Sequence, residues 1–397
     1  MELSELFEAY YECRRHKRKT VNALAFELDY ESNLIALYEE VKNRTYSVGK
    51  SIAFIVDKPV KREIFAGDFR DRVIHHSIIR KLNPLFEKLF IHDSYSCREG
   101  KGTLFGIKRV DTFIRGASEN YTRDAYILKL DIEGFFMNID RSVLLTQIRK
   151  VIDTKYVGDD KEELFWLCQK VVRNDPTTNC IIKGRREDWV GLPRSKSLFF
   201  ARPGVGLPIG NLTSQVFANL YLHDLDIFIK KKLKIRHYGR YVDDFILIHE
   251  DGRYLKGLIG EIRSFLSEHL GLSLHPNKIY FQPFSKGVSF LGALIKPHRI
   301  YVGKRIKTNL FVEIERINRM IVEDTKVLHD REIQKHILSS LNSYLGLMQH
   351  FDTFTIRKKL LLGLDASFWN YFYISERYRL IVAKTRELSQ MDWQNIL

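Results

Sequence analysis

The chain has 397 residues, 45% of them hydrophobic, which is enough for roughly two or three domains with buried cores. Lys and Arg number 64 against 49 Asp and Glu, and this net charge of +15 is spread along the chain, which favours a polyanionic partner. A basic protein can also be merely soluble, so charge alone does not identify the partner. Because no signal peptide and no apolar run of about 18 residues is evident, we expect a cytoplasmic protein without membrane contact.

The first region, to about residue 125, is basic and mixed in pattern. Residues 71–90 predict a helix, because apolar side chains recur there at helical spacing: Ile74, Ile78, Leu82, Leu85 and Leu89. The region contains many cations and few candidate catalytic acids, so the acids must be sought further along the chain.

The second region alternates strands and helices, which indicates an α/β layer. Residues 126–130 form an apolar, buried strand, and Asp140 can cap the helix that follows it. Residues 238–248 predict two short strands around an Asp-Asp pair, and residues 288–292 predict another strand that ends at a glycine.

The third region, from about Lys304, is predicted to be helical. Two amphipathic stripes run along it, and their opposite faces are polar and basic. Such a bundle could follow the backbone of a nucleic-acid duplex, although a packed bundle with a solvated face has the same pattern. The stripes comprise Leu310, Ile314, Ile317 and Ile321, then Ile333, Ile337, Leu341, Leu345 and Met348.

Three aspartates occupy positions suited to a metal site. Asp131 ends the strand 126–130, while Asp243 and Asp244 fall at the predicted tip of a hairpin with apolar arms. Joining a nucleotide to a 3′ hydroxyl requires divalent metals held by hard oxygen ligands on rigid elements. Ordinary Asp-Asp turns exist, but crowded carboxylates are costly unless a cation compensates them. We therefore predict metal-dependent nucleotidyl transfer.

Two motifs make the chain recognisable. Residues 241–244, Tyr-Val-Asp-Asp, resemble the Tyr-x-Asp-Asp box of reverse transcriptases. Residues 130–136, Leu-Asp-Ile-Glu-Gly-Phe-Phe, resemble the metal-binding motif that precedes this box in the same family. The order and spacing of the two motifs agree with the family.

The resemblance implies a cofactor and its ligands. Two Mg²⁺ ions, for which Mn²⁺ can substitute, are expected on Asp131, the backbone carbonyl of Ile132 and Asp243, with Asp244 completing the acidic cluster. Tyr241 is expected among the nucleotide-binding residues. Phe136 would be the steric gate, a bulky ring that leaves no room for a 2′ hydroxyl and so selects deoxynucleotides. The alternative for Phe136 is plain core packing.

Residues 206–215 open a predicted helix that lies between these two motifs in the chain. Asn211, Gln215 and Asn219 share one polar face of this helix, while an adjacent face carries Leu212, Val216 and Leu220. We expect the apolar face to pack on the catalytic sheet and the polar face to meet the template and the incoming base. Glycines in the segment allow the backbone to approach the substrate closely.

The same box departs from the commonest reverse transcriptase pattern. Most members carry Gln-Gly followed by Ser-Pro, whereas here Ile209-Gly210 is followed by Ser214-Gln215. This is similar to the box of diversity-generating retroelement enzymes, which copy a template RNA with frequent errors at adenines. Ile209, Gly210 and Gln215 are therefore expected to contact the nucleotide.

Further segments resemble group II intron-type enzymes. Residues 94–100 carry the family arginine, Arg98, expected with Asn211 and Asn219 at the template or primer. Arg62, Arg70 and Arg72 are candidates for gripping the triphosphate, because guanidinium forks bind phosphate oxygens bidentately. Each could instead be a surface residue or an ion-pair partner.

Downstream segments complete the resemblance. Lys278 matches the lysine that protonates the leaving pyrophosphate, although a plain surface lysine is an alternative. Leu291 and Gly292 resemble the primer-grip hairpin, and residues 342–346 resemble a thumb helix.

The resemblance implies an α+β fold, a right-hand polymerase with fingers, an antiparallel palm sheet and a helical thumb. We expect N-terminal helices and fingers over residues 1–125, and the palm, with part of the fingers interleaved, over residues 126–300. The thumb is expected over residues 301–365. A C-terminal extension of unassigned role is expected over residues 366–397.

The expected function is reverse transcription in a diversity-generating retroelement. Expected partners are a structured template RNA, cDNA, the RNA–DNA duplex, dNTPs and a small basic accessory protein. One alternative is an antiphage-defence reverse transcriptase that copies an associated noncoding RNA. A group II intron enzyme is a third option, weakened by the absence of an endonuclease segment after the thumb. From another class, a catalytically inactive RNA-binding protein remains to be tested.

Overall fold

The computed structural model describes residues 1–15, 20–57 and 60–384. The chain divides into two compact units, Met1–Gly102 with Ala125–Phe281, and Thr103–Asp124 with Gln282–Leu397. Within the described residues, no helix combines the length and apolar character needed to cross a membrane. The division into fingers, palm, thumb and extension at residues 125, 300 and 365 stays a prediction.

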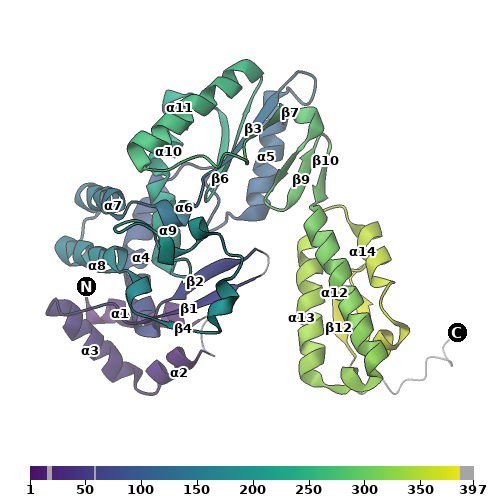
Figure 1. The fold of residues 1–397 in the computed structure, drawn as a ribbon, viewed down its shortest axis with the longest axis horizontal. Helices are drawn as coiled ribbons and strands as arrows, with labels where there is room; N and C mark the ends of the chain where they lie inside the picture. The colour runs from purple at the N-terminus through teal and green to yellow at the C-terminus, as the bar shows by residue number, and fades with distance from the viewer. Residues whose placement is uncertain (16–19, 58–59, 385–397) are drawn as a thin grey trace. The chain divides into compact units, whose positions relative to one another are not determined.

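The N-terminal part of the first unit is helical (Figure 1). Its longest helix, α4, begins after Asp68, whose side chain accepts a hydrogen bond from the Arg70 amide. Ile74, Ile78 and Leu82 are fully buried, which confirms the helix predicted from their spacing. Helix α1 packs along α4. The helices are α1 (Leu3–Arg14), α2 (Val21–Glu27), α3 (Tyr30–Lys42) and α4 (Phe69–Leu89).

A small sheet follows these helices, in the order β2-β1-β4. Strands β1 (Ser51–Val56) and β2 (Arg62–Ala66) are antiparallel, and β4 (Cys180–Ile182) joins β1 in parallel. Exposure alternates along β2, so Arg62 is exposed while Glu63 is buried. Consecutive residues of β2 therefore serve opposite faces of the sheet.

A four-stranded sheet forms the centre of the first unit, in the order β5-β6-β3-β7. Strands β3 and β5 both pair antiparallel with β6. Side chains along β3 such as Ile127, Leu128 and Leu130 are buried, which confirms the predicted strand. The strands are β3 (Tyr126–Asp131), β5 (His237–Tyr241), β6 (Asp244–His249) and β7 (Tyr280–Pro283).

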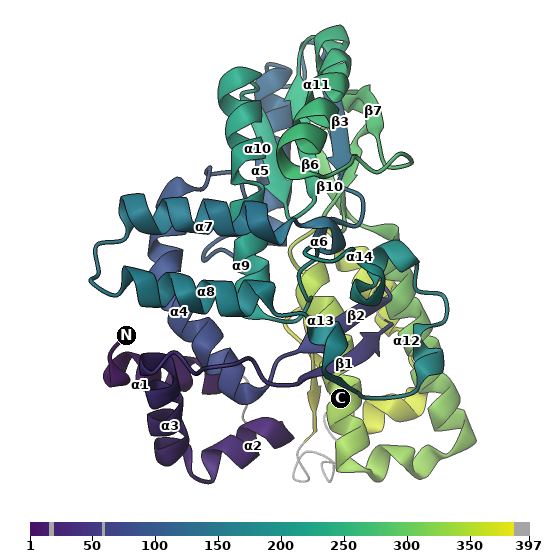
Figure 2. The ribbon, with the colours of Figure 1, turned by 60° about the vertical axis from the view of Figure 1, so that its left-hand side comes forward.

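Helices cover this sheet and join it to α4. Helix α11 packs on β3 and β6, while α9 packs on α4 and α7. Figure 2 shows α7 and α8 side by side, which agrees with their many close contacts. Asp140 caps α7 as predicted, accepting from the Ser142 and Val143 amides. The helices are α6 (Phe135–Asn138), α7 (Arg141–Lys155), α8 (Lys161–Arg173), α9 (Leu212–Tyr221), α10 (His223–Ile227) and α11 (Gly252–Leu270).

The second unit has its own core, built from both predicted amphipathic stripes. Of the stripe residues, Ile333 is only partly buried and the others are fully buried. A three-stranded sheet in the order β10-β9-β8 and a β11–β12 hairpin accompany the helices. The elements are α5 (Thr103–Ala117), β8 (Val288–Phe290), β9 (Ala293–Lys296), β10 (Arg299–Val302), α12 (Lys304–Glu323), α13 (Arg331–Met348), α14 (Phe354–Leu361), β11 (Phe372–Ser375) and β12 (Leu380–Ala383).

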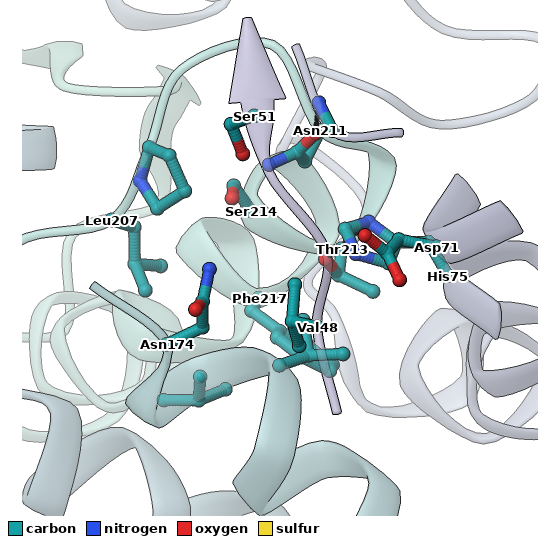
Figure 3. A pocket seen from close by; sticks show the side chains of 14 residues that line it. Val48, Ser51, Asp71, His75, Asn174, Leu207, Asn211, Thr213, Ser214 and Phe217 are labelled. Carbon is teal, nitrogen blue, oxygen red and sulfur yellow. Dashed lines mark hydrogen bonds between the residues drawn. The ribbon is translucent and has the colours of Figure 1, made fainter. Parts of the chain in front are cut away.

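A small cavity lined by both polar and apolar side chains lies between α4 and the start of α9 in the first unit (Figure 3). Its volume of about 10 Å³ suits roughly one water molecule. Asp71 accepts hydrogen bonds from the Tyr46 hydroxyl at 2.8 Å and the Gly49 amide at 2.9 Å. Burial nevertheless raises the pKa of Asp71 to about 6. Beside it, burial lowers the pKa of His75 to about 3, and the Thr213 hydroxyl lies 3.1 Å from His75 Nδ1.

Asp71 should make the stability of the fold depend on pH. Its pKa is about 6 in the folded protein against an ordinary value of 3.8, so between these values the folded protein holds a proton that the unfolded chain has released. The free energy of unfolding should therefore fall as pH rises through this window, by up to about 3 kcal/mol from this group. Urea unfolding of wild type and Asp71→Asn at about pH 4 and about pH 7 measures this component. An unchanged difference between the two proteins at both pH values would contradict it.

Candidate active site

The strands that carry the aspartates are neighbours in the central sheet. In the β3–β6 ladder Asp131 pairs directly with Asp244, so both side chains lie on one face. Tyr241 also pairs with Asp244, which leaves Val242 and Asp243 as a two-residue turn. The sequence predicted both aspartates at the hairpin tip, but Asp244 instead begins β6. The two-residue loop of the hairpin decides this, because it pairs Tyr241 with Asp244.

The segment after β3 turns its backbone toward this hairpin. Ile132 faces Leu274 in an isolated antiparallel bridge, flanked by bonds from Glu133 N to Ser273 O and from His275 N to Asp131 O. In such a pair the backbone groups of Ile132 point away from Leu274. The Ile132 amide accordingly donates to the Asp243 carbonyl at 3.2 Å. The Ile132 carbonyl therefore points toward the side on which Asp243 lies.

Burial and charge set the electrostatics of the three carboxylates. Burial, and then the negative charge of Asp131, raise the pKa of Asp243 to about 6. Burial also raises the pKa of Asp244 to about 6, against the opposing effect of Lys129. The Lys278 ammonium lies 2.8 Å from Asp131 Oδ1, and the Lys129 ammonium lies 3.3 Å from Asp244 Oδ2. Cationic charge thus already compensates two of the acids.

The carboxylates fit a divalent metal in chemistry but do not converge on one point. Asp244 Oδ1 is buried and has no hydrogen-bond partner, as a ligand oxygen would be before it binds a cation. Hard oxygen donors of this kind suit Mg²⁺. However, no group of three His, Cys, Asp or Glu side chains in the described part of the chain is arranged to hold one metal ion. Lys278 and Lys129 each hold one of the aspartates instead.

A buried ion pair stabilises the turn at Val242 and Asp243. Arg240 and Asp226 are both fully buried, and their two hydrogen bonds measure 2.8 and 2.6 Å. Arg240 Nη1 also donates to the Val242 carbonyl at 3.0 Å. Val242 has φ +55°, a strained conformation for a β-branched residue, so the turn needs such support. Sequence reasoning missed Asp226 and Arg240; the only signal was an arginine within an apolar strand.

The polar face predicted on α9 is mostly buried, which corrects part of the prediction. Asn219 donates to the Ser96 carbonyl at 2.7 Å and accepts from Arg240 at 3.3 Å. Asn211 is buried and accepts from the Gly67 amide at 3.1 Å. Only Gln215 is exposed, beside the Cys97 thiol. The two asparagines therefore hold the protein together and are not free to reach a template.

Phe136, Ile209 and Gly210 meet beside β2. Phe136 is half-buried, whereas its neighbour Phe135 is buried in the main core. The Phe65 amide donates to the Ile209 carbonyl at 2.8 Å. Gly210 has φ +125°, and a Cβ there would lie 2.8 Å from Ile64 Cγ2, so only glycine fits. The structure thus brings the predicted gate and the Ile209-Gly210 pair together.

The three predicted triphosphate arginines have different surroundings. Arg62 is exposed on β2, and its charge acts on Asp243 and Tyr241 by lowering both pKa values, although burial raises them overall. Arg72 donates to the Gly67 carbonyl and lines a cavity of about 980 Å³ together with Gly210 and Gln215. Arg70 instead pairs with Glu40 and lies over the Tyr46 ring, and its predicted contact with the nucleotide stays a prediction.

Arg98 is also committed to the fold. It donates to Glu87 and to the carbonyls of Ile91 and Ser94, and its side chain is only 6% exposed. These contacts give Arg98 a structural role, and its predicted contact with template or primer stays a prediction. Leu291 and Gly292 belong to the second unit, where both have positive φ in the turn between β8 and β9.

Breaking the buried ion pair should destabilise the first unit. Asp226→Ala leaves the Arg240 guanidinium buried without its carboxylate, so we expect the free energy of unfolding to fall by about 3–5 kcal/mol. Asp224→Ala is the matched control, because Asp224 lies on the same helix but is exposed. Chemical denaturation of both variants measures the difference. Equal and small effects would show that the pair is dispensable.

Comparisons with known proteins place the chain in a family. The profile described as reverse transcriptase (RNA-dependent DNA polymerase) matches residues 60–295. Protein YkfC of Escherichia coli is 22% identical over 61% of this chain and 65% of its own length. Nuclear intron maturase 1 of Arabidopsis thaliana is 21% identical over 59% of this chain and 41% of its own length. Apo telomerase from Candida tropicalis aligns with a TM-score of 0.48, at 12% identity, over 80% of this chain and 58% of that one.

The chain thus spans less than two thirds of each of these proteins. The family match covers strands β2 and β4 of the small sheet, the whole central sheet and all three aspartates. It confirms the predicted α+β, right-hand polymerase fold, with its mixture of helices and antiparallel sheets. The chain therefore belongs to the reverse transcriptase family of RNA-dependent DNA polymerases, with relatives among intron maturases.

Proposed function

We propose that this protein is an RNA-directed DNA polymerase that makes cDNA from a structured template RNA. The observation that carries the proposal is the pairing of Asp131 with Asp244 across adjacent strands, with Asp243 in the adjoining turn. All three lie within the segment that matches the family. When bound, Mg²⁺ would activate the primer 3′ hydroxyl and neutralise the triphosphate.

The predicted site residues would have different roles in that reaction. Asp131, the Ile132 carbonyl and Asp243 would hold the two metal ions, and Asp244 would complete the acidic cluster; Mn²⁺ could replace Mg²⁺. The lysine ammonium groups now on Asp131 and Asp244 show that cationic charge is accommodated there. Lys278, once displaced from Asp131, would be free to protonate the leaving pyrophosphate. Leu291 and Gly292 stay candidates for the primer contact.

The nucleotide would be bound from the side of β2. Arg62 is the best-placed triphosphate ligand, because its exposed guanidinium acts electrostatically on Asp243 and Tyr241. Gln215 and Arg72 share a cavity with Gly210 and suit contacts with the base pair or template. Phe136 would select the sugar, since Phe135 already fills the core.

Phe136→Ala tests the steric gate. Removing the ring makes room for a 2′ hydroxyl, so ribonucleotide incorporation relative to deoxynucleotide should rise at least about tenfold. Primer extension with each sugar measures the ratio. Phe228→Ala is the matched control, because Phe228 is another half-buried aromatic and stacks on Phe265 of α11. Unchanged sugar discrimination in Phe136→Ala would reduce Phe136 to a packing residue.

We further propose that the protein serves a diversity-generating retroelement, with a small basic accessory protein as partner. The support is the Ile209-Gly210 and Ser214-Gln215 pattern, whose exposed members, Gly210 and Gln215, line one cavity with Arg72. An apolar Ile209 offers no polar contact that would help to check the nascent pair. The second candidate is an antiphage-defence enzyme that copies its own noncoding RNA, since the catalytic residues would be the same.

Sequencing of RNA and cDNA that copurify with the protein separates these roles. Wild type should yield cDNA with errors concentrated at template adenines, and Asp243→Ala with Asp244→Ala should yield none. Faithful or repetitive cDNA from one noncoding RNA would favour the defence role. Bound RNA without any cDNA, together with no incorporation in Mg²⁺ or Mn²⁺, would identify a catalytically inactive RNA-binding protein.

A further inference from the structure

Glu63 is a buried carboxylate that no predicted function uses. It is only 1% exposed, and its neighbour on β2 is Arg62. Oε2 accepts from Trp189 Nε1 at 2.8 Å and from the Ser197 hydroxyl at 2.8 Å, while Oε1 accepts from the Leu198 amide at 2.6 Å. A buried carboxylate with three donors is both costly to leave unpaired and strongly directional when paired.

All three donors come from one irregular segment, residues 186–200. It contains only short 3₁₀ turns, Arg186–Trp189, Arg194–Lys196 and Leu198–Phe200. The backbone hydrogen bonds within these turns join residues only three apart, so they do not anchor the segment to the rest of the fold, and tertiary contacts must fix its position. Glu63 supplies three of them from a strand of the small sheet.

The inner face of this segment packs against the nucleotide-selecting residues. Leu198 belongs to a small core with Ala53, Phe65 and Met137, and Phe136, Ile209 and Trp189 pack against that core. The Ser195 carbonyl lies 2.7 Å from where a Cβ on Gly134 would stand, so the segment also abuts the loop before Phe136. Phe136, the predicted gate, therefore packs against a segment whose position Glu63 fixes.

We propose that Glu63 is a positioning residue for nucleotide selection. By fixing Trp189, Ser197 and Leu198, it sets the packing behind Phe136 and Ile209 and so the room available to the sugar. Arg62, the proposed triphosphate ligand, lies on the same strand, so β2 would position residues for both triphosphate binding and sugar exclusion. This inference rests on the proposed polymerase function.

Kinetics of matched deoxy- and ribonucleotides on a primer–template test the proposal. Glu63→Ala should lower sugar discrimination on the order of tenfold and raise KM for the deoxynucleotide more than it lowers kcat. Glu63→Gln should have a smaller effect, because its amide keeps an acceptor for Trp189 and Ser197 but turns N–H groups toward the Leu198 amide. Ser197→Ala removes one bond and should shift discrimination in the same direction. Glu187→Ala, an exposed acid on the same segment, is the control.

The outcomes are distinguishable. Folded Glu63→Ala with unchanged sugar discrimination, or with equal losses for both sugars, would overturn the proposal and leave Glu63 a structural residue. If melting shows that Glu63→Ala is unfolded, the discrimination ratios of Glu63→Gln and Ser197→Ala decide in the same way. Failure of wild type to incorporate any nucleotide would instead overturn the proposed function on which the inference rests.

Discussion

The pairing register between β3 and β6 is the constraint on which the rest of the site depends. It sets Asp131 opposite Asp244 and leaves Asp243 in a two-residue turn beside them. Side chains alternate along a strand, so a shift of one residue would move Asp131 to the other face. The buried apolar residues of both strands oppose such a shift, because it would expose them to water. Core packing therefore fixes the relative positions of the acids.

The site gathers charge that the fold must compensate. Burial raises the pKa of Asp243 and of Asp244 to about 6. Lys129 of β3 pairs with Asp244, and Lys278, before β7, pairs with Asp131. Beneath the turn, the Arg240–Asp226 pair is fully buried and also holds the strained Val242 carbonyl. Buried pairs of this kind add little net stability but fix a geometry, and here they fix the turn that carries Asp243.

The alternation of side chains along β2 organises the side of the site where we propose that the nucleotide binds. Arg62 and Glu63 are neighbours in sequence, yet one faces the acidic site and the other faces the irregular segment 186–200. That segment, together with Phe65 and Met137, backs Phe136 and Ile209. A two-residue stretch of strand thus connects the charge that would bind a triphosphate with the packing that would shape the sugar pocket.

The sequence alone determined the elements whose signals are local. Apolar spacing predicted α4, β3 and the helices of the second unit, an N-cap aspartate predicted the start of α7, and two short motifs pointed to the family that the comparison confirmed. These features depend on residues near one another in the chain, so periodicity and capping reveal them.

Only the tertiary structure decided which polar side chains are bonded within the protein and which are exposed to a ligand. Asn219, Arg98 and Arg70 all resembled ligand contacts in the sequence, yet their partners are Ser96, Glu87 and Glu40. Asp226, Arg240 and Glu63 gave almost no sequence signal, although Asp226 and Arg240 support the turn and Glu63 binds the segment behind the proposed gate. Hydrogen-bond partners far apart in the chain are chosen by burial and strand register, and neither is encoded in local spacing.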